Sequence, residues 1–488
     1  MAASAFSRSL LNWSAAALLA GCAGGAPESN PAALSVDRPH ASHAAAKNAA
    51  GATTAEYFGG TVTANPKVYV VWWGDPSKIN SAVTAATGGI ADFFSGVLNS
   101  SFMDWMNEYD TAITVPAGSH MGMPGTGQHI GRGNYAGALT LTNIPSGNVT
   151  DAQIQTTLDA AIVAGTLPPP DDNTLYAVYF PPGVTISLDG DSSCSGFGAY
   201  HDAIIETQRH NTYYLVMPDC GAPFKNMTSV STHELIEAVT DNIPTPGSSP
   251  NYPQAWNDSG GNEMGDLCNS SSTVTTPLGM FTVQNIWDER TKACKAFSSD
   301  TNDYNVSISP NVAKVDLNAS NTYTVQTATS AGAAQMLTLS ATAPSGVTAT
   351  ISPTTIMSGS TATLTVVATS PPAQTGLQVV VRADASATQT HTAALLLSTT
   401  TFVPPPDLGS SPPDLAPAPA DLAQGTDPGT GNGGDDMAVG TGVGGNGQPP
   451  PSHGCSYAAT ANGGSWPQAT LLLLALALLA VRRRDGRA

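Results

Sequence analysis

Four cysteines in the middle of the chain limit its fold more than any other feature. They are Cys194, Cys220, Cys268 and Cys294, and the other two of the six cysteines lie near the chain ends. An even number of cysteines in a short stretch of an exported chain predicts disulfides. No two of them have the close Cys-x-x-Cys spacing of a zinc site, which favours disulfides over metal binding. Three connectivities are open, and of these we expect Cys194–Cys220 with Cys268–Cys294.

The first 22 residues have the features of an export signal. Arg8 precedes an apolar run over residues 10–20, which ends in the tetrapeptide Leu19-Ala20-Gly21-Cys22. This arrangement resembles a bacterial lipoprotein signal, in which the cysteine is lipidated and becomes the mature N-terminus. A plain secretory signal is the alternative. Both interpretations predict that the protein is exported.

The last segment, residues 454–488, predicts attachment to the cell envelope. Gly454-Cys455 is followed by a short apolar run over 471–481 and then by Arg482, Arg483 and Arg484. The run is short for a helix that must cross a hydrocarbon core of about 30 Å. The pattern resembles the C-terminal sorting tag of myxobacterial surface proteins, whose tail is removed near the cysteine. An uncleaved membrane anchor is the alternative. The two chain ends together predict a location at the cell surface or outer membrane, on the extracellular face.

Length and charge set two further limits. A chain of 488 residues is too long for one ordinary core, so several domains are expected. The formal net charge is −19, from 17 basic and 36 acidic residues. This balance excludes a nucleic-acid partner, because few cations are present to neutralise phosphates. Cationic ligands or metals fit better.

The sequence predicts a flexible tether over residues 23–53 and the first domain over residues 54–298. Continuous apolar, β-branched and aromatic runs predict buried strands at 67–74, 174–180 and 212–217. Apolar residues at three- and four-residue steps predict one or two helices within 79–109, and a capping box at Thr150 predicts another. We therefore expect an α/β domain with a zincin-like mixed sheet plus helices.

The composition changes near residue 303. Residues 303–400 are rich in Ser, Thr, Ala and Val, with period-two alternation and regularly spaced glycines. This predicts an Ig-like β-sandwich, with the single His391 at its surface. Residues 401–453 are rich in Pro, Gly and Asp, with too few large apolar residues to bury a core. They predict a disordered linker.

The segment Ser231-Thr232-His233-Glu234-Leu235-Ile236-Glu237 carries the main candidate site. On a helix, His233 and Glu237 lie four residues apart and share a face. They correspond to the two histidines of the zinc-binding motif His-Glu-x-x-His, and Glu234 corresponds to its general base. Glutamate can replace the second histidine because carboxylate oxygens also bind zinc.

A third ligand must come from elsewhere in the chain. Glu263 is the first choice and Asp266 the second, both in a glycine-flanked turn, while Asp258 and Asp241 are weaker candidates. His201 is a candidate for orienting substrate or stabilising an oxyanion. The expected ion is Zn²⁺, but the Glu263 turn could instead hold Ca²⁺, which prefers oxygen ligands.

Two alternatives remain for the helix residues. Ser231-Thr232-His233-Glu234 has the form of a capping box, so Glu234 could satisfy backbone donors at a helix start. A helix that begins earlier, near Thr228, would release Glu234 for chemistry. A histidine and a glutamate four residues apart also occur as an ordinary surface pair.

Several blocks of the first domain resemble the exordium, or phosphate-induced protein, family. They are 57–74, 150–170, Tyr200-His201, 213–220, the His233 to Asp241 helix, 263–268 and 283–287. Members are extracellular or wall-associated proteins linked to growth signalling. The form His-Glu-x-x-Glu departs from the standard metallopeptidase motif. Two hypotheses follow: an exported metal-dependent hydrolase, most simply a peptidase acting on peptide or cell-wall substrates, or a non-catalytic surface protein with a structural ion.

Overall fold

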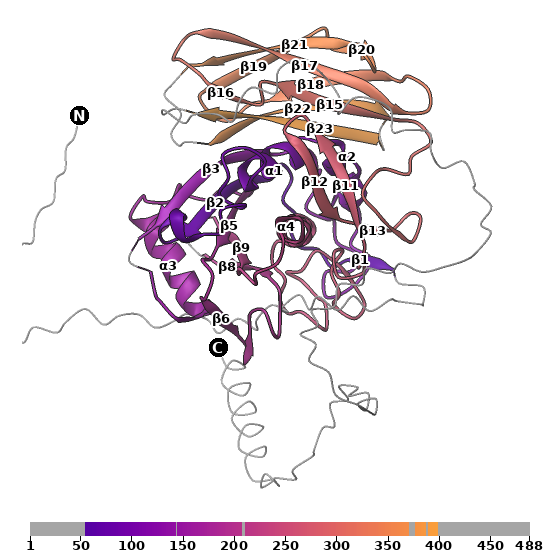
Figure 1. Ribbon diagram of the computed structural model, residues 1–488. Helices are drawn as coiled ribbons and strands as arrows, with labels where there is room; N and C mark the ends of the chain where they lie inside the picture. The colour runs from indigo at the N-terminus through magenta and orange to yellow at the C-terminus, as the bar shows by residue number, and fades with distance from the viewer. Residues whose placement is uncertain (1–53, 143, 207–209, 370–375, 387–388, 399–488) are drawn as a thin grey trace, which may run out of the picture. The chain divides into compact units, whose positions relative to one another are not determined.

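The computed structural model describes residues 54–142, 144–206, 210–369, 376–386 and 389–398 (Figure 1). Strands and isolated bridges take up 41% of these residues, and helices take up 15%. The expected α/β, zincin-like fold of residues 54–298 is therefore wrong. The domain has several separate sheets, and hairpins occupy much of the chain that follows the helix with His233.

The first domain is built around a five-stranded sheet in the order β3-β2-β5-β9-β8. The strands are β2 (Lys67–Trp73), β3 (Asn134–Leu141), β5 (Thr174–Tyr179), β8 (Tyr200–Ile204) and β9 (Thr212–Met217). β3, β2, β5 and β9 run parallel, and β8 pairs antiparallel with β9 at one edge. Every residue of β2, β5 and β9 is buried, which explains their continuous apolar sequences and confirms the three predicted strands.

The two faces of this sheet belong to two separate apolar clusters. Side chains alternate along a strand, so Val70 of β2 points to one face and Val71 to the other. The first face packs against α1 (Ile90–Val97) and α4 (Phe224–Thr240). The second packs against α3 (Asp151–Val163). The sheet thus fixes α4, the helix that carries His233.

The start of α3 follows from local capping. Thr150 Oγ1 accepts a hydrogen bond from Gln153 N at 3.3 Å, and Gln153 Oε1 accepts one from Thr150 N at 2.9 Å, which confirms the predicted capping box. The helices expected within 79–109 are short. The pieces in this part of the chain are 3₁₀ helix η1 (Pro76–Lys78), α1, α2 (Ser101–Asp104) and 3₁₀ helix η2 (Trp105–Tyr109).

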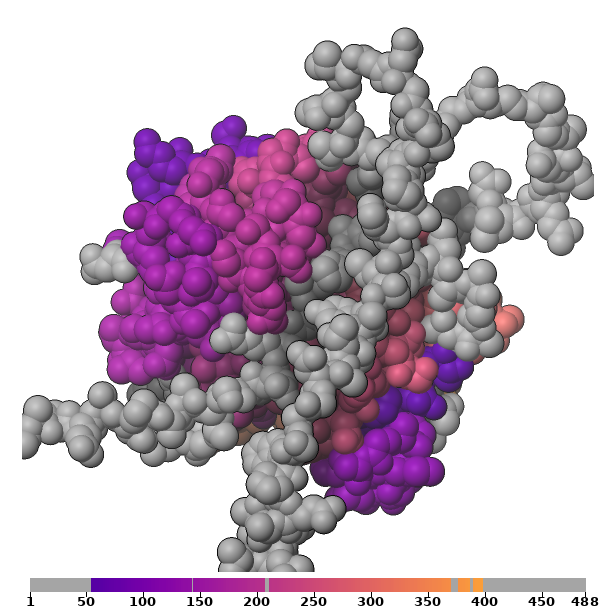
Figure 2. Space-filling model, turned by 90° about the horizontal axis from the view of Figure 1, so that it is seen from below, coloured from indigo at the N-terminus to yellow at the C-terminus, as the bar shows by residue number. Residues whose placement is uncertain are grey.

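Small sheets and hairpins complete the first domain. The two-stranded pairs are β1 (Ala55–Tyr57) with β10 (Trp256–Asp258), β11 (Ser271–Thr276) with β12 (Gly279–Gln284), and β13 (Ile286–Asp288) with β14 (Ala293–Lys295). A three-stranded sheet contains β4 (Asn148–Thr150), β6 (Thr185–Leu188) and β7 (Asp191–Ser192). α4 packs against β12 as well as against β8 and β9. Most of the surface seen in Figure 2 belongs to this domain, coloured purple to rose.

Both expected disulfides are present, Cys194–Cys220 and Cys268–Cys294. The first joins the chain ahead of β8 to the turn after β9. The second joins the end of the turn with Glu263 and Asp266 to β14. Two disulfides are typical of an extracellular, surface-located protein.

The second domain consists of two sheets stacked on a common core, seen as two layers of strands in Figure 1. The four-stranded sheet contains β15 (Asp303–Ser309), β17 (Ser320–Ala331), β21 (Thr361–Ala368) and β19 (Val347–Ser352). The five-stranded sheet contains β16 (Val312–Lys314), β23 (Gln389–Ser398), β22 (Leu377–Ser386), β18 (Met336–Thr342) and β20 (Thr355–Met357). This agrees with the all-β domain expected here.

His391 is not at the surface, and that expectation is wrong. Its side chain is 1% exposed, and its Nε2 lies 2.8 Å from Asp303 Oδ1. The ring also packs edge-on against Tyr304, with the centroids 4.5 Å apart. An alternating Ser/Thr-rich strand pattern does not reveal this pair, because Asp303 lies on a strand that is distant in sequence.

The predicted terminal segments lie outside the described residues. They are the signal over 1–22 with Cys22, the tether over 23–53, the linker over 401–453, and the sorting segment over 454–488 with Cys455. In the part of the chain that the structure describes, no helix is long and apolar enough to cross a membrane.

Candidate metal centre

α4 places three candidate residues in the core of the first domain. The helix starts at Phe224, directly after Pro223, so Glu234 lies in its interior rather than at its N-terminus. The interpretation of Ser231 to Glu234 as a capping box is therefore wrong. Thr232 Oγ1 instead donates to the Thr228 carbonyl, four residues back, at 2.7 Å. His233 and Glu237 share one face of the helix, with His233 Nε2 3.1 Å from Glu237 Oε1.

His201 enters the centre from the sheet. It lies on the edge strand β8, beside α4. Its Nε2 is 3.0 Å from the Asp241 carbonyl oxygen, which can only accept. Its Nδ1 lies 3.7 Å from Glu234 Oε2 and 3.7 Å from Glu237 Oε2. His201 is 3% exposed, so it faces the carboxylates and not the solvent.

The turn between β10 and β11 brings Glu263 and Asp266 to the same place. Glu263 Oε1 lies 3.4 Å from His201 Nε2, and Asp266 Oδ1 lies 3.7 Å from His233 Nε2. The Asp266 backbone N–H donates to Glu237 Oε1 at 3.1 Å. The six predicted catalytic and ligand residues therefore come together in one cluster, from β8, α4 and this turn.

Gln284 at the end of β12 is a neighbour that the sequence did not indicate. Its Nε2 lies 2.8 Å from the Gly265 carbonyl oxygen, 3.0 Å from that of Cys268, and 2.8 Å from His233 Nδ1. The amide has two hydrogens for three neighbours, and the two carbonyl oxygens can only accept. The contact therefore does not fix which nitrogen of His233 carries the proton. A neutral amide has no spacing signature that could have identified it.

The two weaker ligand candidates have structural roles instead. Asp241 accepts hydrogen bonds from the Ala255 backbone N–H and from Asn257 Nδ2. Asp258 Oδ1 accepts from the backbone N–H groups of Gly260 at 2.8 Å and Asn262 at 2.9 Å, which closes its own turn. Both carboxylates are satisfied by the protein.

Several atoms of the cluster lack a hydrogen-bond partner in the described part of the chain. They are His233 Nε2, Glu237 Oε2 and Glu263 Oε1, in residues that are each at most 8% exposed. A buried polar atom without a partner is costly. The described ion pairs of Glu237, Glu263 and Asp266 are with histidines, not with lysine or arginine. The centre therefore carries excess negative charge in a buried place.

The titration of the cluster reflects this charge. Burial raises the pKa of the Glu263 carboxyl to about 7, against the opposing effect of His201. Burial raises the pKa of Glu237 as well, well above its ordinary value. Burial would lower the pKa of His201, but the carboxylates of Glu263, Glu234 and Glu237 together raise it. These raised pKa values mean that the cluster holds protons more tightly than the same groups do in water.

The residues fit a metal ion. Two groups of three residues each have ligand atoms within 4.8 Å of one another: His201 with Glu237 and Glu263, and His233 with Glu234 and Glu237. Imidazole and carboxylate donors together suit Zn²⁺, whereas Ca²⁺ takes oxygen donors only. The side chains of His233 and Asp266 are the most exposed of the cluster, at 11% and 19%.

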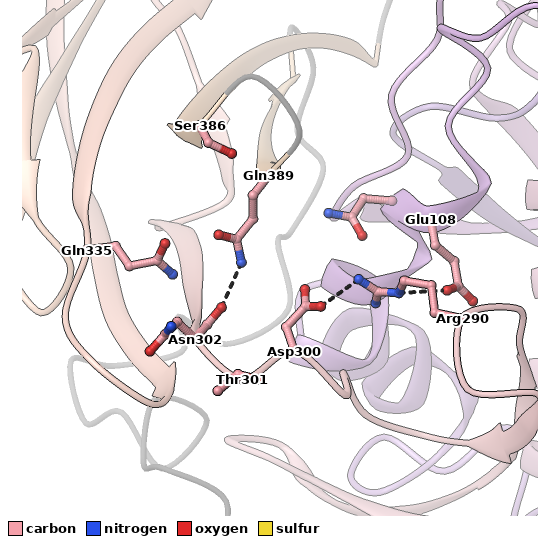
Figure 3. Close-up of a pocket in the computed structure, with 9 residues that line it drawn as sticks. Glu108, Arg290, Asp300, Thr301, Asn302, Gln335, Ser386 and Gln389 are labelled. Carbon is pink, nitrogen blue, oxygen red and sulfur yellow. Dashed lines mark hydrogen bonds and ion pairs between the residues drawn. The ribbon is translucent and has the colours of Figure 1, made fainter.

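A cavity of about 500 Å³ elsewhere in the chain includes none of these residues. Its lining is polar, and Figure 3 shows Arg290 reaching both Glu108 and Asp300. Arg290 Nε donates to Glu108 Oε2 at 3.0 Å, and Arg290 Nη1 donates to Asp300 Oδ1 at 2.6 Å. Its charged groups are paired with each other, so it is not the centre of the chemistry considered below.

Comparison with known proteins gives no family. No protein-family model and no curated protein matches the chain. Domains 4 and 5 of the S-layer protein SbsC share 10% identity over 27% of this chain and 66% of that fragment, with a TM-score of 0.17. A FixG-related protein from Vibrio parahaemolyticus shares 13% identity over 21% of this chain and 98% of its own, with a TM-score of 0.16. Similarities this low carry no argument about function.

Proposed function

We propose that the protein is an exported, surface-located, metal-dependent hydrolase of peptidase type. The observation that carries the proposal is that His233 Nε2, Glu237 Oε2 and Glu263 Oε1 are buried in one cluster without hydrogen-bond partners in the described residues. A divalent cation would satisfy these atoms and offset the charge of the surrounding carboxylates. Zn²⁺ is the ion that the mixed nitrogen and oxygen donors favour.

The proposed roles follow from the positions of the side chains. His233, Glu237, Glu263 and Asp266 would hold the ion, which supplies Lewis-acid polarisation of a scissile carbonyl when bound. Glu234 lies in the helix interior next to His233 and is 1% exposed. We propose that its carboxylate takes a proton from an attacking water. We propose peptides or cell-wall material as substrates, reached from the side of His233 and Asp266.

The attachment of the protein is also a proposal. The two disulfides fit a location outside the cytoplasm. Anchoring to the outer membrane or cell envelope would act through the chain ends, by lipidation at Cys22 and processing at Cys455.

A second candidate function is that of a non-catalytic surface protein of the exordium type, in which the same residues hold a structural ion. One observation favours it: His201, Glu234 and Glu237 are each at most 3% exposed. A structural site is closed, whereas a catalytic one keeps a position open to substrate.

The test uses the exported full-length protein. We expect bound zinc by elemental analysis and a melting temperature that falls when a chelator removes it. We then expect Glu234→Gln to keep zinc and melting temperature but to lose hydrolysis of a peptide library by about 10²-fold or more. Glu56→Gln on β1 serves as the matched control and should keep activity.

Two outcomes would contradict the hydrolase proposal. A wild type with zinc that is inactive across the library supports the structural ion instead. A wild type without bound metal, whose melting temperature does not respond to zinc, calcium or chelator, removes both candidates.

A further inference from the structure

The two groups of donors in the centre meet at one residue. Glu237 belongs both to the group with His201 and Glu263 and to the group with His233 and Glu234. A single ion uses one such group, so the presence of two groups needs an explanation.

The two carboxylate oxygens of Glu237 face different histidines. Oε1 lies 3.1 Å from His233 Nε2, and Oε2 lies 3.7 Å from His201 Nδ1. Oε2 has no hydrogen-bond partner among the described residues, and Glu237 is fully buried. Ligand atoms about 2.0–2.2 Å from a zinc ion lie roughly 3–4 Å apart, as these atoms do. A carboxylate in this position can bridge two ions, with one oxygen on each.

His201 has the orientation of a ligand. Its Nε2–H donates to the Asp241 carbonyl oxygen at 3.0 Å, so that in the neutral ring, the form that binds a metal, the lone pair of Nδ1 is directed at Glu234 and Glu237. Metal-bound histidines commonly donate their other N–H to a backbone carbonyl in this way. Glu263 is the third residue of this second group. Its Oε1 lies 3.4 Å from His201 Nε2 and has no hydrogen-bond partner in the described chain.

The charge of the centre also favours two ions. The cluster contains the carboxylates of Glu234, Glu237, Glu263 and Asp266, whereas Asp241 is occupied by its own hydrogen bonds. One divalent ion would offset half of the charge of four carboxylates, and two would offset all of it.

We propose that the centre binds two divalent cations bridged by Glu237, one on the side of His233 and Asp266 and the other held by His201 and Glu263. This inference rests on the proposed function only in that both need a metal at the centre. Pairs of ions about 3.5–4 Å apart, bridged by shared ligands, are a known arrangement in hydrolytic sites. Glu234 contacts both groups of donors and keeps the position of the base.

The experiment counts ions on the full-length protein. The metal-free protein is titrated with Zn²⁺ by calorimetry, and the zinc content after gel filtration is measured by elemental analysis. Co²⁺ in place of Zn²⁺ gives an optical count of the same sites. We expect two equivalents for the wild type and one for Glu263→Gln, which removes a charge without removing volume. Asp258→Asn, a change in a nearby carboxylate that closes its own turn, should keep two.

The outcomes separate the two proposals. One equivalent in the wild type overturns the second ion and leaves the single-ion hydrolase standing. No bound metal overturns both. Two equivalents in Glu263→Gln would overturn the assignment of the second ion to Glu263. Because the wild-type count decides the main question, misfolding of a variant does not leave it open.

Discussion

The two disulfides provide a matched pair for testing how the centre is held. Each closes a loop with a sequence separation of 26. In the chain-entropy model, the loss of either bond destabilises the fold by about 3.5 kcal/mol at 25 °C. Of the two bonds, only Cys268–Cys294 lies at the end of the turn that carries Glu263 and Asp266. Of the four cysteines, only Cys268 has its carbonyl oxygen in contact with Gln284. Equal loop lengths thus predict similar losses of stability. The position of Cys268 at the donor turn predicts that losing its bond weakens metal binding more than losing the other.

The perturbation is the replacement of each cysteine pair by alanine in the full-length protein. For Cys194→Ala with Cys220→Ala, we expect a loss of about 3.5 kcal/mol and an unchanged zinc affinity. For Cys268→Ala with Cys294→Ala, we expect the same loss plus about 1 kcal/mol, because Cys268 is buried in the core. The zinc dissociation constant of this second variant should rise by about tenfold or more, as when supporting groups around a metal site are lost.

Urea unfolding is followed by tryptophan fluorescence, which reports on the first domain. Trp72, Trp73, Trp105, Trp256 and Trp287 lie within it, and residues 303–398 contain no tryptophan. Zinc affinity is measured by calorimetry on the same samples. An equal loss of zinc affinity in both variants would refute the argument that Cys268–Cys294 holds the donor turn. A difference in stability well above 1 kcal/mol would refute the estimate from loop length.

Two further predictions concern single side chains. An alanine at Gly265 would place its Cβ 2.8 Å from both Glu237 Oε1 and His233 Nδ1, so Gly265→Ala should weaken zinc binding by about 10–100-fold in calorimetry. Gly198→Ala, whose Cβ meets nothing within 4 Å, is the control, and equal effects would contradict the steric reasoning. In the second domain, burial acts to lower the pKa of His391, but the contact with Asp303 outweighs it and the pKa is raised. Burial acts to raise the pKa of Asp303, but pairing with His391 outweighs it and the pKa is lowered. The histidine contribution is complete below pH 6.5 and is lost as pH rises through its raised pKa, whereas the aspartate contribution is complete above pH 3.8 and is lost as pH falls through its lowered pKa. His391→Asn should therefore destabilise the second domain most between pH 3.8 and pH 6.5, by about 3 kcal/mol. A difference in calorimetric melting that does not depend on pH would count against the ion pair.

The sequence predicted those parts of the fold that depend on local patterns. The buried runs of β2, β5 and β9 and the capping box of α3 are explicit in the residues themselves. The fold class of the first domain was predicted incorrectly, because hairpins such as β11–β12 depend on pairing between two strands, which the sequence of either strand alone does not show. The start of α4 at Phe224 was missed because Ser231-Thr232-His233-Glu234 is a plausible helix start when read alone.

The candidate residues could be chosen from the sequence, but not their arrangement. His233, Glu234 and Glu237 share a helix, so their proximity follows from helical spacing. His201 lies on a short edge strand with the sequence Tyr-His-Asp-Ala-Ile, which has neither clear alternation nor a continuous apolar run. Its approach to Glu237 depends on the packing of α4 against β8, which is a property of the folded domain.

The bond between Cys268 and Cys294 also determines where the protein can acquire an ion. Disulfides of this kind form in oxidising compartments and not in the reducing cytosol. The turn with Glu263 and Asp266 is therefore closed only after the chain has left the cytosol. Any ion that the centre holds would be acquired outside the cytosol, and its identity would depend on which metals are supplied there.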